Sequence, residues 1–232
     1  MNYPELAEKN CFINHEGDTV LGPYLSALKF HPPGLAPVED ESGWYHIDIQ
    51  GNPAYHQRYR RAFGFYDGRA AVVDEEGQWF HIDVQGRRIS LHSYRWCGNF
   101  QEQRCVVRDD HSRYFHIDKE GCPLYPQKYA YAGDYKDGYA CVKLMSGGWK
   151  HIDKKGDYLY QPEFLDLGVF HKGFATAKDA DGWMHINKEG VPLYPQRYAM
   201  VEPFYNGFAL VTDNFGAKKI VDESGRLVLN IG

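Results

Sequence analysis

Five histidines stand at equivalent places along this sequence and are the residues best suited to carry chemistry. Each is followed by isoleucine and then by aspartate or asparagine, and successive copies are 34 or 35 residues apart. They are His46, His81, His116, His151 and His185. Imidazole is a frequent metal ligand and titrates near neutral pH, so a ring of these side chains could bind a metal ion or respond to pH.

Distances favour a structural role for these histidines. Equivalent residues of neighbouring packed sheets lie about 10 Å apart or more, whereas two ligands of one metal ion lie within about 4 Å of each other. We therefore expect each imidazole to pack beside a tryptophan and to donate an N–H to a backbone carbonyl or a carboxylate. Metal binding by the five histidines stays open as the alternative, and no cofactor is predicted.

The phrase around each histidine belongs to a longer repeat. Degenerate copies at residues 12–14 and 220–222 extend it to both ends of the chain, and a glycine follows each copy at intervals of 34 or 35 residues. These glycines are Gly17, Gly51, Gly86, Gly121, Gly156, Gly190 and Gly225. Self-similarity at this period indicates a repeat architecture, so we expect a single repeat domain over residues 1–232.

One repeat shows how the chain should fold locally. Residues 138–143 alternate and are rich in small and β-branched side chains, and residues 149–153 alternate strictly, so both segments are predicted strands. Asp153 can accept backbone N–H bonds and Gly156 can adopt a positive φ, which is typical of a tight hairpin. A third strand is then expected at residues 158–161.

The expected fold class is all-β. No helical period of useful length follows residue 10, and each repeat of about 35 residues accommodates a three-stranded antiparallel meander with room for a short fourth strand. A propeller-like ring of six or seven small blades hides most sheet edges and is our prediction; an open β-repeat superhelix is the alternative. The expected segments are an N-terminal cap and hairpin at 1–33 and repeats at 34–67, 68–102, 103–137, 138–172, 173–206 and 207–232.

Composition narrows the function classes. The net charge of −5 gives no general attraction to nucleic acid or to an anionic membrane, so neither is an expected partner. No signal peptide and no membrane-spanning stretch is recognised, which favours a soluble cytoplasmic protein; export to another cell without a classical signal peptide stays open. The five cysteines lack a CxxC pair and suit free thiols, and Cys105 replaces a small core alanine of other repeats.

Departures from the repeat are the candidate binding residues, because packing does not explain them. Residues 96–104 replace a usual glycine by Gln103 and concentrate amides, a carboxylate and arginines, and residues 165–172 form a second irregular connector. The candidates are Arg95, Trp96, Asn99, Gln101, Glu102, Arg104, Arg108, His171 and Lys172. Ten of the twelve arginines lie between Arg58 and Arg113, and this window is either a salt-bridged surface or an anion-binding or partner-binding patch.

The repeat resembles the bacterial WG-repeat family, whose units carry Trp-Gly-aromatic-Ile-Asp, a turn glycine, a tyrosine and an aromatic-x-x-Gly-x-Ala-x-Val strand. The matching residues include Trp44, His46 to Asp48, Gly51, Tyr59 and the segment 65–72. The chain departs from the family in the glycine after the tryptophan and in the aromatic that histidine replaces. The resemblance implies an interaction scaffold and brings no catalytic residues.

Three function classes follow. A non-catalytic binding or scaffolding module with a protein or peptide partner is the leading hypothesis. A lectin-like module, in which tryptophan and tyrosine stack on sugar rings, is the second. An enzyme or metal protein that uses the repeated histidines is the third, although the chain contains no Gly-x-Ser-x-Gly, P-loop, dinucleotide or His-Glu-x-x-His motif.

Overall fold

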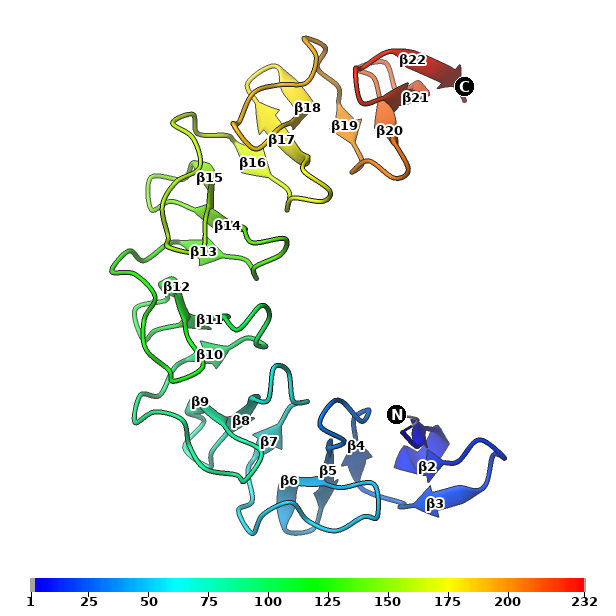
Figure 1. The fold of residues 1–232 in the computed structure, drawn as a ribbon, viewed down its shortest axis with the longest axis vertical. Helices are drawn as coiled ribbons and strands as arrows, with labels where there is room; N and C mark the ends of the chain where they lie inside the picture. Colours follow the sequence, from blue (N-terminus) through cyan, green and yellow to red (C-terminus); the bar gives the residue numbers. More distant parts are fainter. Residues whose placement is uncertain (1–2, 232) are drawn as a thin grey trace. The chain divides into compact units, whose positions relative to one another are not determined.

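The computed structural model describes residues 3–231, and within this range the chain is built from short antiparallel strands. The strands form seven small sheets, six of three strands and one of four, that follow one another along the chain (Figure 1). Two compact units divide the chain, one up to Leu124 and one from Tyr125 onward. The all-β fold of tandem repeats predicted from the sequence is confirmed.

The first unit contains four sheets, each a meander of three strands in chain order. A single turn of 3-10 helix, η1 (Glu8–Asn10), separates its first two strands. The strands are β1 (Glu5–Leu6), β2 (Phe12–Ile13), β3 (Thr19–Leu21), β4 (Ser26–Ala27), β5 (Ala36–Asp40), β6 (Gly43–Ile47), β7 (Arg61–Ala62), β8 (Ala70–Val73), β9 (Trp79–Ile82), β10 (Trp96–Cys97), β11 (Cys105–Arg108) and β12 (Tyr114–Ile117).

The second unit contains three sheets, and the last of them gains a fourth strand. Its strands are β13 (Tyr131–Ala132), β14 (Ala140–Lys143), β15 (Trp149–Ile152), β16 (Asp166–Leu167), β17 (Ala175–Asp179), β18 (Gly182–Ile186), β19 (Met200–Val201), β20 (Phe208–Thr212), β21 (Lys218–Asp222) and β22 (Leu227–Asn230). The predicted single domain over 1–232 and the predicted closure into a ring stay predictions.

The middle strand of each repeat is the core of its sheet. All four residues of β8 are buried, and the first three residues of β14 are buried as well. Strands covered on both faces carry runs of small and β-branched residues in place of a hydrophobic-polar alternation. Packing against neighbouring sheets therefore explains the Ala-x-Val pattern of the repeat.

The turn after each histidine strand has the predicted chemistry. Asp48 Oδ1 accepts hydrogen bonds from the backbone N–H groups of Gln50 and Asn52, each at 2.9 Å. The Gly51 N–H donates to the Asp48 carbonyl at 3.0 Å, and Gly51 adopts φ of 84°. These bonds to the carboxylate lower the pKa of Asp48 although its partial desolvation acts in the opposite direction.

The prediction of a strand at residues 158–161 is wrong. Tyr158 forms only an isolated bridge with Ile152, and the chain then leaves the sheet. The third strand comes instead from the segment before the middle strand, for example β13, which pairs with β14. The reason is that Tyr160 turns its ring toward the neighbouring repeat, where it contacts the turn glycine Gly190.

Candidate functional site

Four of the repeated histidines, His46, His81, His151 and His185, join their sheet to the next one within a unit. In the first unit, His46 Nε2 lies 2.8 Å from the carbonyl oxygen of Phe63, which follows β7 of the next sheet. In the second unit, His151 Nε2 lies 2.9 Å from the Gly168 carbonyl and His185 Nε2 lies 2.8 Å from the Glu202 carbonyl. The predicted bond from imidazole to a backbone carbonyl is therefore present.

The other ring nitrogen meets a tyrosine nine residues further along the chain. His151 Nδ1 lies 2.6 Å from the Tyr160 hydroxyl, and His46 makes the same contact with Tyr55. A carbonyl oxygen can only accept, so Nε2 carries the proton and Nδ1 accepts the bond that the tyrosine hydroxyl donates. Both nitrogens of these imidazoles are thus occupied by hydrogen bonds, which leaves neither lone pair for a metal ion.

Burial keeps these histidines neutral. Desolvation lowers the pKa of His46, His81 and His151 to about 4 in each case, and the hydrogen bond to the carbonyl opposes the shift only in part. The imidazole of His151 also packs on Phe170, with ring centroids 4.1 Å apart. An aromatic of the next repeat is therefore the packing partner, where the sequence had suggested the neighbouring tryptophan.

His81 departs from this arrangement. Ser90 replaces the tyrosine of other repeats, and His81 Nδ1 is buried without a hydrogen-bond partner among the described residues. Its Nε2 lies 3.0 Å from the Gly98 carbonyl and 3.4 Å from Cys105 Sγ. Because Nε2 carries the proton, this nitrogen is no base for the thiol, and both side chains are buried. The pair lacks the features of a nucleophilic site.

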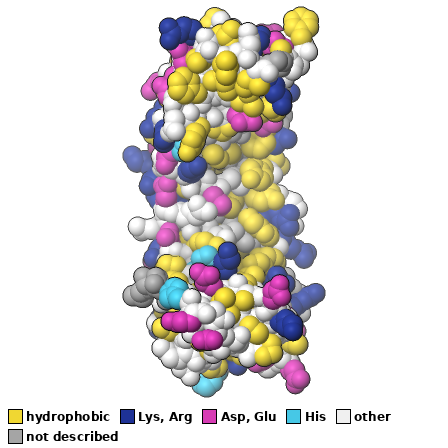
Figure 2. Space-filling model, turned by 90° about the vertical axis from the view of Figure 1, so that its right-hand side faces the viewer, with side chains coloured by type: hydrophobic (Ala, Val, Ile, Leu, Met, Phe, Trp, Pro, Cys, Tyr) yellow, Lys and Arg dark blue, Asp and Glu magenta, His cyan; other side chains and the backbone are white. Residues whose placement is uncertain are grey.

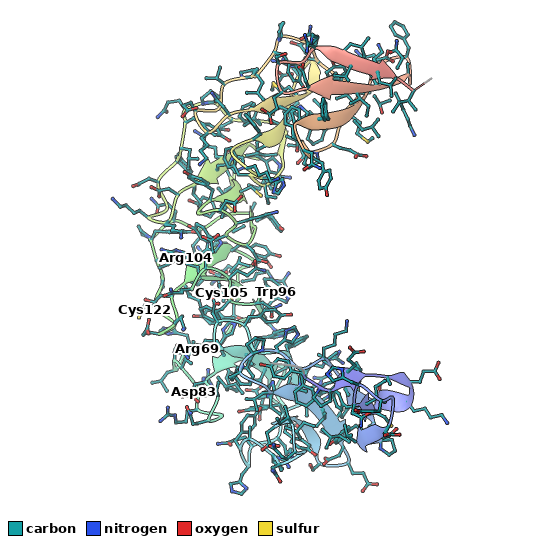
Figure 3. The ribbon with its side chains drawn as sticks, turned by 45° about the vertical axis from the view of Figure 1, so that its right-hand side comes forward. Arg69, Asp83, Trp96, Arg104, Cys105 and Cys122 are labelled. Atoms are coloured by element: carbon teal, nitrogen blue, oxygen red, sulfur yellow. The ribbon has the colours of Figure 1, made fainter. Side chains whose placement is uncertain are left out.

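The predicted binding residues of the first unit separate into two groups. Trp96 on β10 pairs with Arg108 on β11, whereas residues 101–104 form the turn that joins these strands at their other end. Figure 3 shows Trp96 and Arg104 on either side of Cys105. These residues are close in sequence but lie on two surfaces at opposite ends of one hairpin.

The first surface is a row of three side chains across the sheet β10–β12, which we call the aromatic-arginine row: Trp96, Arg108 and Tyr114. The register pairs Trp96 with Arg108 and Arg108 with Tyr114. The Arg108 guanidinium carbon lies 5.8 Å from the centre of the Tyr114 ring, and the Trp96 and Tyr114 rings are 6.3 Å apart. All three side chains are partly exposed.

The arginines around this row differ in their partners. Arg95 forms an exposed ion pair with Asp110 at 3.0 Å, and Arg113 forms one with Asp109, also at 3.0 Å. Arg108 forms no ion pair among the residues from 3 to 231, and its Nε is buried without a hydrogen-bond partner. Local pairing thus accounts for several arginines of the cluster but leaves the charge of Arg108 uncompensated.

The second surface is the hairpin turn that contains Gln101, Glu102 and Arg104. Glu102 and Gln103 adopt φ of 49° and 62°, where most other repeats place a glycine second. The Gln103 N–H donates to Asp67 Oδ2 at 2.7 Å, which ties this turn to the equivalent turn of the preceding repeat. A pocket of about 200 Å³ lies between Gln103, Arg104 and residues 118–120.

The remaining predicted residues lie elsewhere. Asn99 is partly exposed in the connection between the two surfaces. His171 and Lys172 belong to the second unit, where they begin the turn that is closed by hydrogen bonds between His171 and Phe174. They occupy the positions of Gln101 and Glu102 in their own repeat and thus form an equivalent turn there.

Sequence reasoning missed a larger pocket in the first unit. A pocket of about 510 Å³ is lined by His31, Pro32, Pro33, Phe65, Tyr66, Asp67, Gly68 and Val84. The His31 and Tyr66 rings are 4.7 Å apart, and the Tyr66 hydroxyl lies 3.4 Å from His31 Nε2. Only the departure of residues 31–34 from the turn pattern of later repeats could have pointed to it.

The described chain lacks a metal-binding cluster and a membrane-spanning helix. Between residues 3 and 231, no three side chains of histidine, cysteine, aspartate or glutamate are grouped so that they could hold one metal ion. The same residues contain no helix of the length and apolarity needed to cross a membrane. The five cysteines form no disulfide.

Comparison with solved structures gives similarity in fold at low sequence identity. A eukaryotic initiation factor structure is 11% identical, with a TM-score of 0.56 over 90% of this chain and 65% of that chain. BamB from Moraxella catarrhalis is 14% identical, with a TM-score of 0.47 over 88% and 75% of the two chains. Hsv2p from Kluyveromyces lactis is 9% identical, with a TM-score of 0.45 over 90% and 78%.

Comparison by sequence identifies the repeat itself. No curated protein matches the chain. The family model described as WG containing repeat matches residues 152–183 and again residues 183–214. These two matches cover consecutive repeats of the second unit, from the end of β15 to the turn after β20. Residues 152–214 therefore match the WG containing repeat, the family that the sequence resembles.

Proposed function

We propose that this protein is a non-catalytic binding scaffold that captures a protein or peptide partner on the aromatic-arginine row of its first unit. The observation that carries the proposal is the state of Arg108. Arg108 is partly exposed, its guanidinium lies 5.8 Å from the Tyr114 ring, and it forms no ion pair among residues 3–231. Its Nε is buried without a hydrogen-bond partner among the same residues.

The chemistry of the row indicates the kind of partner. Guanidinium groups bind carboxylates through charge-assisted hydrogen bonds, and a buried donor without a partner is costly until a ligand or water satisfies it. Tryptophan, tyrosine and arginine are also the residues that dominate protein interfaces. A peptide segment that offers a carboxylate to Arg108 and an apolar side chain to Trp96 fits this surface.

A peptide array tests the proposal directly. The labelled protein is applied to short peptides that differ in charge and aromatic content, and retention is measured at low and high salt. We expect peptides with aspartate or glutamate beside an apolar residue to be retained. Arg108→Gln should weaken their binding by at least about tenfold, the usual consequence of losing a buried charged hydrogen bond.

Arg87→Gln is the matched control, because Arg87 lies in the same unit, is 73% exposed and is already paired with Asp83. Both variants should unfold at the temperature of the wild type. Equal binding by Arg108→Gln and Arg87→Gln would contradict the proposal. Retention of glycans in place of peptides would favour the carbohydrate hypothesis, for which the stacked rings of Phe63 and Trp79 offer a platform.

A further inference from the structure

One contact recurs between successive repeats: a side chain of one repeat lies over the turn glycine of the next repeat. A side chain opposite the histidine position covers the turn glycine of the next repeat, so closely that a Cβ on the glycine would collide with it. At Gly86 such a Cβ would lie 2.5 Å from Tyr55 Cγ, and at Gly51 it would lie 2.7 Å from Leu21 Cδ2. The pairs are Leu21 with Gly51, Tyr55 with Gly86, Ser90 with Gly121, Tyr125 with Gly156, Tyr160 with Gly190 and Tyr194 with Gly225.

The first repeat carries a turn glycine that no side chain of residues 3–231 covers. Gly17 adopts φ of 88°, as the other turn glycines do, but a Cβ added to it would meet nothing within 4 Å. The residues around it, from His15 to Val20, are exposed. The first sheet therefore exposes a turn glycine, Gly17, that could accept a covering side chain.

The last repeat carries a covering side chain without a glycine to cover. Leu229 on β22 lies opposite Ile220, and the register shifts between Ile220 and Val221. In the first repeat, Leu21 lies opposite Phe12, and the register shifts at the same place. Leu229 thus occupies the position from which Leu21 covers Gly51, yet its side chain is 57% exposed.

The surroundings of the two halves are complementary. Leu227, Val228 and Ile231 are also at least half exposed, and Figure 2 shows hydrophobic side chains gathered over this last sheet, in the upper part of the view. Gly17 is flanked by the exposed carboxylates of Glu16 and Asp18. Lys218 is exposed on β21 of the last sheet and carries the opposite charge.

We propose that the first sheet of a second copy of this chain docks on the last sheet of the first copy, so that Leu229 of one copy covers Gly17 of the other. The contact reuses the geometry that already joins the repeats within each unit. It is heterologous, since each copy contributes a different surface, and it would propagate head to tail. Apolar residues on an uncovered sheet are the expected driving force.

Crosslinking between differently tagged copies tests the proposal. One copy carries Gly17→Cys and the other Leu229→Cys, and the mixture is oxidised mildly and separated by mass. In the equivalent contact at Gly225, a Cβ would lie 2.6 Å from Tyr194 Cβ, so a small adjustment brings the two sulfurs into bonding range. We expect a disulfide-linked heterodimer that needs both substitutions and does not form when either variant is mixed with wild type.

Light scattering across a wide concentration range measures the mass of the protein and provides a second test of self-association. We expect the mass of the wild type to rise with concentration and that of Leu229→Asp to stay at the monomer value. Phe215→Asp is the matched control, because Phe215 is 97% exposed in the turn between β20 and β21 of the same sheet and lies outside the covering position.

Three results would overturn the proposal. The first is a wild-type protein that stays monomeric at every concentration. The second is a mass that depends on concentration in the same way for Leu229→Asp and Phe215→Asp. The third is a disulfide that forms within one chain when both cysteines are placed in a single copy at low concentration.

Discussion

At the scale of single residues, the histidines are linkers between sheets. The imidazoles of His46, His151 and His185 donate from Nε2 to a backbone carbonyl of the next sheet and accept at Nδ1 from a tyrosine. A neutral imidazole has one donor and one acceptor, so this pair of bonds satisfies it fully. That arrangement explains how a polar residue can recur in the core of successive repeats.

Tyr160→Phe should destabilise the protein by about 1 to 3 kcal/mol. The variant keeps the ring but removes the hydroxyl that donates to His151 Nδ1, and it leaves a buried acceptor unsatisfied. The free energy of urea-induced unfolding measures the effect. Tyr205→Phe, at an exposed position of the same unit, is the control and should be neutral; equal stability of both variants would refute the linker role.

The sequence predicted part of this site. The repeated histidines indicated a bond to a carbonyl, because a buried polar group needs a partner and their spacing was too long for one metal ion. The tyrosine partner was missed, since the nine residues between His151 and Tyr160 include a turn whose geometry sets the meeting point. The unsatisfied Nδ1 of His81 was missed for the same reason.

At the scale of elements, the turn glycines have two roles: they adopt a positive φ, and some of them also leave space for a side chain of another repeat. Gly190 has φ of 73° and is buried beneath Tyr160, whereas Gly17 has φ of 88° and an open surrounding. The positive φ alone accounts for a glycine at both places. Only the covered glycines also provide the space that a side chain of the preceding repeat needs.

Comparing Gly190→Ala with Gly17→Ala separates these two purposes. Gly17→Ala should cost about 1 kcal/mol, because only backbone strain is added. Gly190→Ala should cost about 3 kcal/mol or more, because its Cβ would also lie 2.6 Å from Tyr160 Cγ and force the ring away. Urea unfolding of dilute protein measures the loss in free energy of unfolding for both variants. Similar losses would mean that the contact between Tyr160 and Gly190 does not hold the repeats together.

At the scale of the whole molecule, the buried histidines couple stability to pH. The pKa of His46, His81 and His151 is about 4 in the folded protein and about 6.5 in the unfolded chain. Between these values the unfolded chain binds more protons than the folded one, so acid favours unfolding. Above about pH 7 the histidines contribute no further change.

We therefore expect the free energy of unfolding to fall steadily as the pH drops from about 7 to about 4. Each of these histidines can contribute on the order of 3 kcal/mol over that range. Lowered carboxylate pKa values, such as that of Asp83, act only at more acidic pH. Urea titrations at stepped pH measure the slope, and His151→Gln should reduce it; a flat profile above pH 5 would contradict the prediction.

The sequence by itself determined the all-β class, the period of the repeat, the Asp-Gly turns and the WG resemblance. These features are local, because alternation and turn chemistry act over a few residues and then recur. It placed Trp96, Arg108 and the segment from Gln101 to Arg104 together among the candidate binding residues, and the tertiary structure separates the first two from that turn. Strand pairing causes this separation, because it places Trp96 and Arg104, which are eight residues apart, at opposite ends of one hairpin. Packing between repeats likewise decided which glycine is covered and left Leu229 and Gly17 without partners.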